Sequence, residues 1–89
     1  MDYIDQDILE LEAALGFGPG RCPGTMINRA LVDLCILREE DGIERTPEEN
    51  RKGYAMIWCL ALGKMLEPKQ FFYGRTIAQA IENAKRQIY

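Results

Sequence analysis

The stretch that decides the fold is residues 54–62, Tyr-Ala-Met-Ile-Trp-Cys-Leu-Ala-Leu, in which every residue is apolar. It follows Thr46-Pro47-Glu48-Glu49, where Thr46 can cap a helix, Pro47 suits the first helical position and Glu49 can close a capping box. We therefore predict a helix from Pro47 to about residue 66. Since its second half is apolar nearly all round, we expect it to be central in the fold, with burial against a second subunit as the alternative.

Two further segments have the pattern of amphipathic helices. Within residues 2–15, one helical face carries Ile4, Ile8, Leu11 and Leu15, and Gly16 suits the position that ends a helix. Residues 77–88 likewise gather their apolar side chains on one side, and Thr76 with Gln79 repeats the capping-box pattern. Both segments predict helices that bury one face and expose the other.

The segments between these helices complete the predicted fold. Residues 25–40 have the pattern of a helix that is apolar on two sides, and residues 16–24, with four glycines and two prolines, predict a loop. The aromatic run in residues 69–74 has strand propensity but no second strand-like run to pair with, so we expect an extended linker packed on the core. The prediction is one all-α domain spanning residues 1–89. It is a compact bundle of about four helices, with a Gly/Pro-rich loop after the first and an extended aromatic linker before the last.

The composition excludes several classes of protein. The longest apolar run, residues 54–63, is about half of what a membrane-spanning helix needs, and the acidic N-terminus is unlike a presequence, so we expect a cytoplasmic protein. The chain has no histidine and three widely spaced cysteines, a pattern that indicates neither a disulfide framework nor a zinc site. The usual general base is therefore missing. We expect no catalysis, no metal and no cofactor.

The glycine-rich loop leaves two questions open. Residues 18–25 lead into a predicted helix start, where backbone N–H groups could hold an anion and Arg21 could add charge, but the lysine of a phosphate-binding loop is missing. A plain connection between two helices is the simpler interpretation. Cys22 beside Arg21 is either an incidental thiol or a reactive one.

The net charge of −3 hides a division of the chain. Residues 1–49 carry twelve acidic against four basic residues, and residues 50–89 carry two against seven. The acidic half is either a solvated surface or a docking surface for a basic partner. The two halves could also face each other inside one fold or within an antiparallel dimer. The basic half interleaves its charges with aromatic residues, as single-stranded nucleic-acid binders do, although such domains are usually basic overall.

Surplus apolar surface and divided charge favour protein binding over the other classes. We expect a small non-enzymatic adaptor, regulatory or inhibitor-type module without a membrane segment, as a monomer or a homodimer, of a size and composition typical of viral or phage accessory proteins. The alternative is a nucleic-acid-associated protein using residues 51–89. The candidate partner-binding residues are Asp5, Glu10, Glu12, Arg21, Trp58, Phe71, Phe72, Tyr73, Arg75, Lys85 and Arg86.

Overall fold

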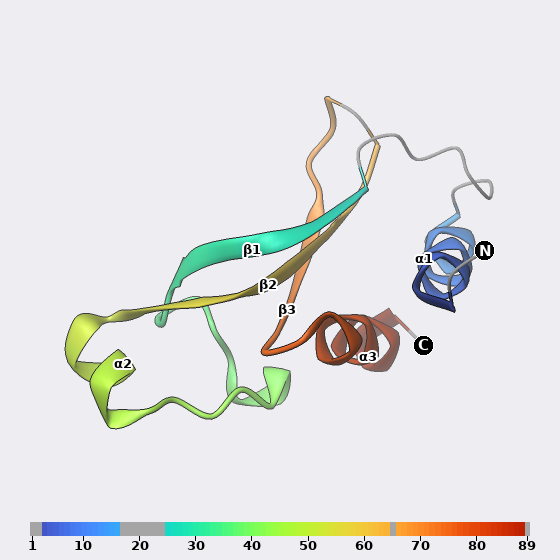
Figure 1. The fold of residues 1–89 in the computed structure, drawn as a ribbon. Coiled ribbons are helices and arrows are strands. Elements are labelled where there is room, and N and C mark those ends of the chain that lie inside the picture. Colours follow the sequence, from blue (N-terminus) through green and yellow to red (C-terminus); the bar gives the residue numbers. More distant parts are fainter. Residues whose placement is uncertain (1–2, 17–24, 65, 89) are drawn as a thin grey trace.

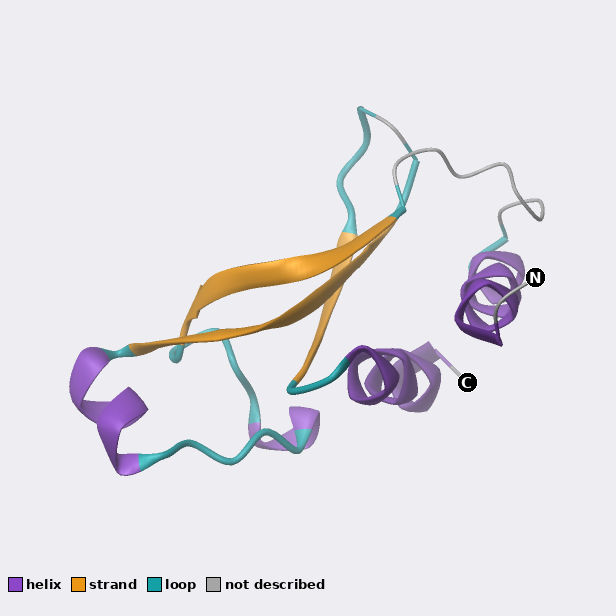
Figure 2. Ribbon diagram, in the orientation of Figure 1, coloured by secondary structure: helices purple, strands orange, loops and turns teal. Residues whose placement is uncertain are grey.

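Three strands form one antiparallel sheet in the order β1-β2-β3 (Figure 2) in the computed structural model, which describes residues 3–16, 25–64 and 66–88. The elements in chain order are α1 (Tyr3–Ala14), β1 (Met26–Asp33), the 3-10 helix η1 (Glu39–Asp41), α2 (Pro47–Lys52), β2 (Tyr54–Leu62), β3 (Gln70–Gly74) and α3 (Ile77–Ile88). The prediction of an all-α bundle of four helices is therefore wrong, because the fold combines this sheet with helices.

The central element is the strand β2 and not a helix. Along its length β2 pairs with β1, and its second half also pairs with β3, so that Leu60 lies opposite both Ile27 and Phe72. The apolar run lacks the alternation of a surface strand because much of β2 is covered from both sides of the sheet. A strand buried on both faces and a helix segment buried on all sides give the same short continuous apolar run.

One face of the sheet, called here the front face, carries the side chains of Trp58, Leu60 and Leu62. It is covered by α3, and α1 packs in turn on α3 (Figure 1). The buried members of this core come from both helices and two strands: Leu11, Leu60, Leu62, Phe72, Ala80, Ile81 and Ala84. The two amphipathic helices predicted at residues 2–15 and 77–88 thus form: α3 buries its apolar face against this end of the sheet, and α1 packs on α3.

The opposite face, called here the back face, is covered by residues 34–46, the segment that contains η1. Its core consists of Val32, Leu34, Leu37, Ala55 and Ile57. The helix predicted over residues 25–40 is therefore wrong: the first part is β1, and the rest turns away from the strand and folds beneath the sheet. A helix that is apolar on two sides and a strand followed by a packed loop both bury many apolar side chains. The apolar content of residues 25–40 therefore does not distinguish between them.

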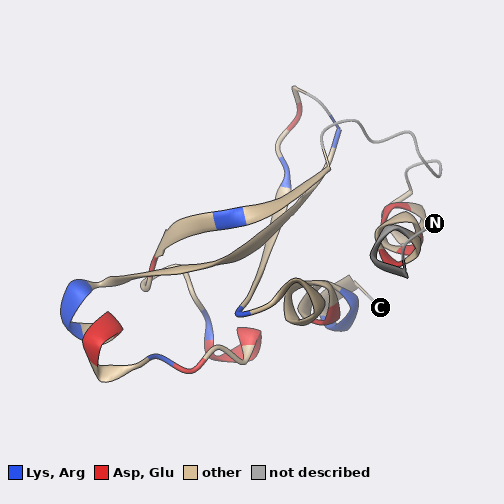
Figure 3. Cartoon of the chain, viewed as in Figure 1, with Lys and Arg blue, Asp and Glu red and all other residues tan. Residues whose placement is uncertain are grey.

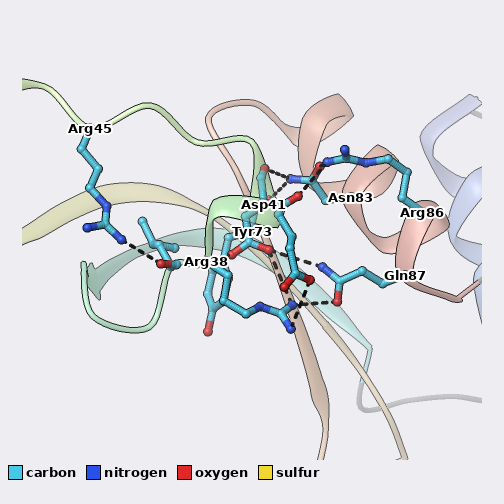
Figure 4. Close-up of polar contacts among 9 residues, drawn as sticks. Arg38, Asp41, Arg45, Tyr73, Asn83, Arg86 and Gln87 are labelled. Atoms are coloured by element: carbon cyan, nitrogen blue, oxygen red, sulfur yellow. Dashed lines mark hydrogen bonds and ion pairs between the residues drawn. The ribbon is translucent and has the colours of Figure 1, made fainter.

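A buried polar cluster fastens this loop to α3. Figure 4 shows Asn83 pointing at Asp41 and Tyr73, and its Nδ2 donates to the Asp41 carbonyl at 2.7 Å and to the Tyr73 carbonyl at 2.6 Å. The Asp41 side chain is itself buried, and its Oδ2 accepts from the Arg38 backbone N–H at 2.9 Å. Because each of these buried groups has a partner, the cluster holds η1, β3 and α3 in one arrangement.

The predicted start of the helix at Pro47 is confirmed, but its predicted length, to about residue 66, is wrong. The Thr46 hydroxyl accepts from the Glu49 N–H at 3.1 Å, and Glu49 Oε1 accepts from the Thr46 N–H at 3.3 Å. The helix ends at Gly53, whose φ of +78° lies in the left-handed region that favours glycine. Residues 70–74 are extended as predicted, but they pair with β2 as the strand β3 and are not an unpaired linker.

Candidate functional site

Most of the basic candidate residues are engaged by partners within the chain. Lys85 Nζ lies 2.7 Å from Asp7 Oδ1, and Arg75 Nη2 lies 2.7 Å from Glu49 Oε1. Arg86 donates to the Glu40 carbonyl and to the side chain of Asn83. Figure 3 shows basic and acidic segments distributed over several elements. Acidic side chains of the first half of the chain thus face basic side chains of the second half inside one fold.

The acidic candidates do not form one docking surface among the described residues. Glu10 is exposed on α1, whereas Glu12, on the same helix, is buried. Asp5 lies within α1, and nothing is described of its side chain. Arg21 and Cys22 lie outside the described residues, and so do most of the loop positions considered for an anion site.

The aromatic candidates separate into core and surface. Phe72 is buried in the front core, and Trp58 is half-buried against it. Tyr73 packs against the back core, where burial raises the pKa of its phenol. Phe71 is 51% exposed and lies on the back face, opposite Ala61. Only Phe71 among these aromatic residues presents a large exposed surface.

Three exposed apolar residues that were not among the predicted binding residues lie together at the other end of the front face. Leu31 is 59% exposed, Met56 50% and Tyr54 45%. Leu31 and Met56 are direct neighbours across β1 and β2, and Tyr54 stands two residues before Met56 on the same side of β2. We call these three residues the open strip. Interpreted as a strand, residues 54–62 place Tyr54 and Met56 on the same face. Interpreted as a helix, they place these two residues on opposite sides.

A groove of about 280 Å³ lies beside the open strip and is closed on its other side by α2. Its charged wall includes Glu49, Lys52 and Arg75. The Arg75 guanidinium binds both carboxylate oxygens of Glu49, at 2.7 and 3.1 Å, and holds the pKa of that carboxyl below its ordinary value. The groove therefore combines an apolar side with a charged side at neutral pH, a combination suited to a polypeptide.

The outer edge of β1 adjoins the open strip. Among the described strands β1 pairs only with β2, so one row of its backbone N–H and C=O groups has no strand beside it. The opposite edge of the sheet is different, because the Tyr73 carbonyl of β3 accepts from Asn83. Unpaired backbone next to exposed apolar side chains is the arrangement that receives an added strand.

Arg29 and Asp33 give the β1 edge its charge. Both residues are exposed, and they stand on either side of Leu31 along the strand. Asp33 Oδ1 accepts from the Cys35 N–H at 3.0 Å, and this hydrogen bond lowers the pKa of the Asp33 carboxyl. The edge thus presents a positive charge, an apolar residue and a negative charge in that order.

No protein-family model, curated protein or solved structure matches the chain. In the part of the chain that the structure describes, no three Cys, Asp or Glu side chains are grouped so that they could hold a metal ion. No helix among these residues is long and apolar enough to cross a membrane. The properties of the surface itself are therefore the basis for a functional proposal.

Proposed function

We propose that the protein is a small non-enzymatic, cytoplasmic protein-binding module that receives another polypeptide along the outer edge of β1 and the open strip. The observation that carries this proposal is that the unpaired sheet edge and the exposed apolar side chains occupy the same place. An added strand would pair its backbone with β1 and bury Leu31 beneath its own side chains. Protein binding remains the proposed function. The open strip replaces Trp58 and Phe72 as the apolar contact surface for the partner, because those two residues pack in the front core.

Burial of the open strip supplies a substantial driving force. Each of its three side chains keeps about half of its surface exposed, so covering one of them contributes roughly 1 kcal/mol. Association also costs several kcal/mol of translational and rotational freedom. The backbone hydrogen bonds of the β1 edge are therefore needed together with the apolar contacts, and a partner without an extended segment would bind poorly.

A selection from a library of displayed extended peptides tests this function. We expect peptides enriched on the wild-type chain to shift the amide NMR signals of residues 26–33 and to lose at least about tenfold in affinity for Leu31→Glu, since a charge would replace a buried apolar contact. Phe71→Glu is the matched control, because Phe71 is almost equally exposed but lies on β3 and the back face. Binding that is insensitive to Leu31→Glu, or equally sensitive to Phe71→Glu, would contradict the proposal.

The nucleic-acid alternative receives less support from the side-chain contacts. Arg75, Lys85 and Arg86 are each engaged by acceptors within the chain, so stacking and phosphate contacts would have to break those interactions first. Fluorescence anisotropy with labelled single-stranded and duplex oligonucleotides across a salt series separates the two functions. Tight binding with a steep salt dependence would replace the present proposal.

A further inference from the structure

The sequence of β1 is complementary to itself when two copies run antiparallel. Along the front face the strand presents Arg29, Leu31 and Asp33 at alternating positions, so the two opposite charges are equally far from Leu31. Two antiparallel copies that continue one sheet are related by a twofold axis perpendicular to it, and both then turn the same face to the same side. The position of the axis decides which residues meet.

An axis through Leu31 places Arg29 opposite the partner's Asp33, and Asp33 opposite the partner's Arg29. An axis through Arg29 or Asp33 would instead place like charges directly opposite each other, which is destabilising. An axis through Ala30 or Val32 would place charges opposite apolar residues. Among these registers of the strand, the one centred on Leu31 therefore satisfies both charges at once.

The same register covers the exposed apolar surface. The two copies of Leu31 meet at the axis, and each is flanked by Met56 on its own β2. Both residues are at least half exposed in the single chain. The pairing therefore buries the apolar neighbours of the sheet edge in the same step that pairs its backbone.

The charged groups are available for these contacts. Asp33 uses Oδ1 to accept from the Cys35 N–H, and its exposed carboxylate has further lone pairs that can receive a guanidinium. Arg29 is exposed, and its guanidinium makes a long 3.5 Å contact with the Met56 carbonyl. Asp33 can keep its hydrogen bond to Cys35 when the two symmetric ion pairs form across the axis, and Arg29 gives up only a long contact.

We infer that the polypeptide received at the β1 edge is a second copy of this chain, paired antiparallel along residues 29–33 about a twofold axis at Leu31. This inference rests on the proposed function, since it names the occupant of the same edge. The dimer has one continuous six-stranded sheet with β1 of both copies at its centre. A three-stranded sheet in a small domain loses one exposed edge by this pairing, and the open strip gains apolar contacts.

Charge exchange tests both the partner and the register. Analytical ultracentrifugation of the full chain should show a concentration-dependent dimer, weakened at least about tenfold by Arg29→Asp or by Asp33→Arg, because like charges then face each other. An equimolar mixture of the two single variants should form a heterodimer, since both ion pairs are restored across the axis. The double variant Arg29→Asp/Asp33→Arg should recover the homodimer for the same reason.

A second measurement leaves Asp33 and its hydrogen bond to Cys35 intact. Leu31→Cys should cross-link between chains under mild oxidation, because residues directly opposite each other in antiparallel strands have Cα atoms about 4.5–5.5 Å apart, within the range of a disulfide. The wild-type chain and Met26→Cys are the controls, since Met26 is similarly exposed on the same strand but lies outside the paired residues and on the back face. Cross-linking in Leu31→Cys above both controls is the expected result.

The possible outcomes separate this inference from the proposed function. A wild-type chain that stays monomeric at all concentrations overturns the second copy as partner, while Leu31-dependent peptide binding would still support strand addition at this edge. A dimer that ignores the charge exchange and does not cross-link through Leu31→Cys overturns the register. Loss of both the dimer and the Leu31-dependent peptide binding would overturn the proposed function as well.

Discussion

Replacement of Gly74 by alanine is expected to be strongly destabilising, because α3 approaches the end of β3 too closely for a side chain. A Cβ atom at this position would lie 2.3 Å from the Ala80 nitrogen, 2.8 Å from the Gln79 carbonyl carbon and 2.9 Å from the Ala80 Cα. All three atoms belong to the backbone of α3, so no side-chain rotation relieves the contact. Gly74 does not have a positive φ, and the requirement for glycine is one of space alone.

The size of the effect follows from what must move. Bringing the shortest contact to an ordinary van der Waals distance displaces the first turns of α3 by about 1 Å, and Ala80 and Ala84 have no exposed surface against the sheet. We expect a loss near the upper end of overpacking costs, about 3 kcal/mol, which is a large share of the roughly 4–13 kcal/mol typical of a domain this size. The melting temperature should fall by roughly 10–20 °C.

Urea unfolding measures this loss through circular dichroism and the fluorescence of Trp58, the single tryptophan. Gly53→Ala is the matched control, since its Cβ would meet no atom within 4 Å and only its φ of +78° opposes alanine, at a cost of about 1–2 kcal/mol. In a four-helix bundle with a linker at Gly74, the same substitution would be neutral or slightly stabilising. A loss for Gly74→Ala below about 0.5 kcal/mol would refute the close approach of α3 to β3.

Substitutions at Leu60, Asn83 and Glu49 examine the core, the polar cluster and the helix cap. Leu60→Ala should cost about 3 kcal/mol in urea unfolding, because Leu60 is fully buried at the centre of the sheet, whereas Leu66→Ala, at a residue 97% exposed, should stay within about 0.5 kcal/mol. Asn83→Leu should cost about 2 kcal/mol, because it leaves the carbonyls of Asp41 and Tyr73 without the Asn83 donor. Asn83→Asp should cost more at neutral pH, because it turns a carboxylate toward those carbonyls. If either variant is as stable as wild type, these hydrogen bonds do not hold the cluster together. The pKa of Glu49 is lowered in the folded chain, so the unfolded chain binds more protons and stability falls as the pH drops through the acidic range. Glu49→Gln should therefore reduce the difference in unfolding free energy between about pH 7 and about pH 3. An unchanged difference would contradict the role of the Arg75–Glu49 ion pair.

Structure that depends on neighbours in the chain was predictable from the residues. The helices at residues 3–14 and 77–88 each have an apolar face with a helical period, and the capping box at Thr46 is completed within four residues. Each of these signals acts over one or two helical turns, so no knowledge of the remaining chain is needed. Both ends of α1 and α3 and the start of α2 were accordingly predicted within a few residues, whereas the end of α2 was not.

The same locality explains why the candidate site was only partly predicted. Arg75 and Lys85 were selected for their charge, but their partners Glu49 and Asp7 lie 26 and 78 residues away. Leu31 and Met56 received no functional role, because in a helical interpretation both belong to a buried face. The exposure of these two side chains depends on how far α3 extends over the sheet, and no residue near Leu31 or Met56 encodes that.

The sequence by itself determined where the helices at both ends of the chain lie, where α2 begins, and how charge is divided between the two halves. The tertiary structure alone decided that residues 54–62 are a strand, since their short apolar run suits a buried helix as well as a strand covered on both faces. Pairing with residues 26–33 and 70–74 resolves that ambiguity, because the backbone of a strand is satisfied by distant segments and that of a helix by its own neighbours. The open strip and the free edge of β1 exist only once that pairing is made.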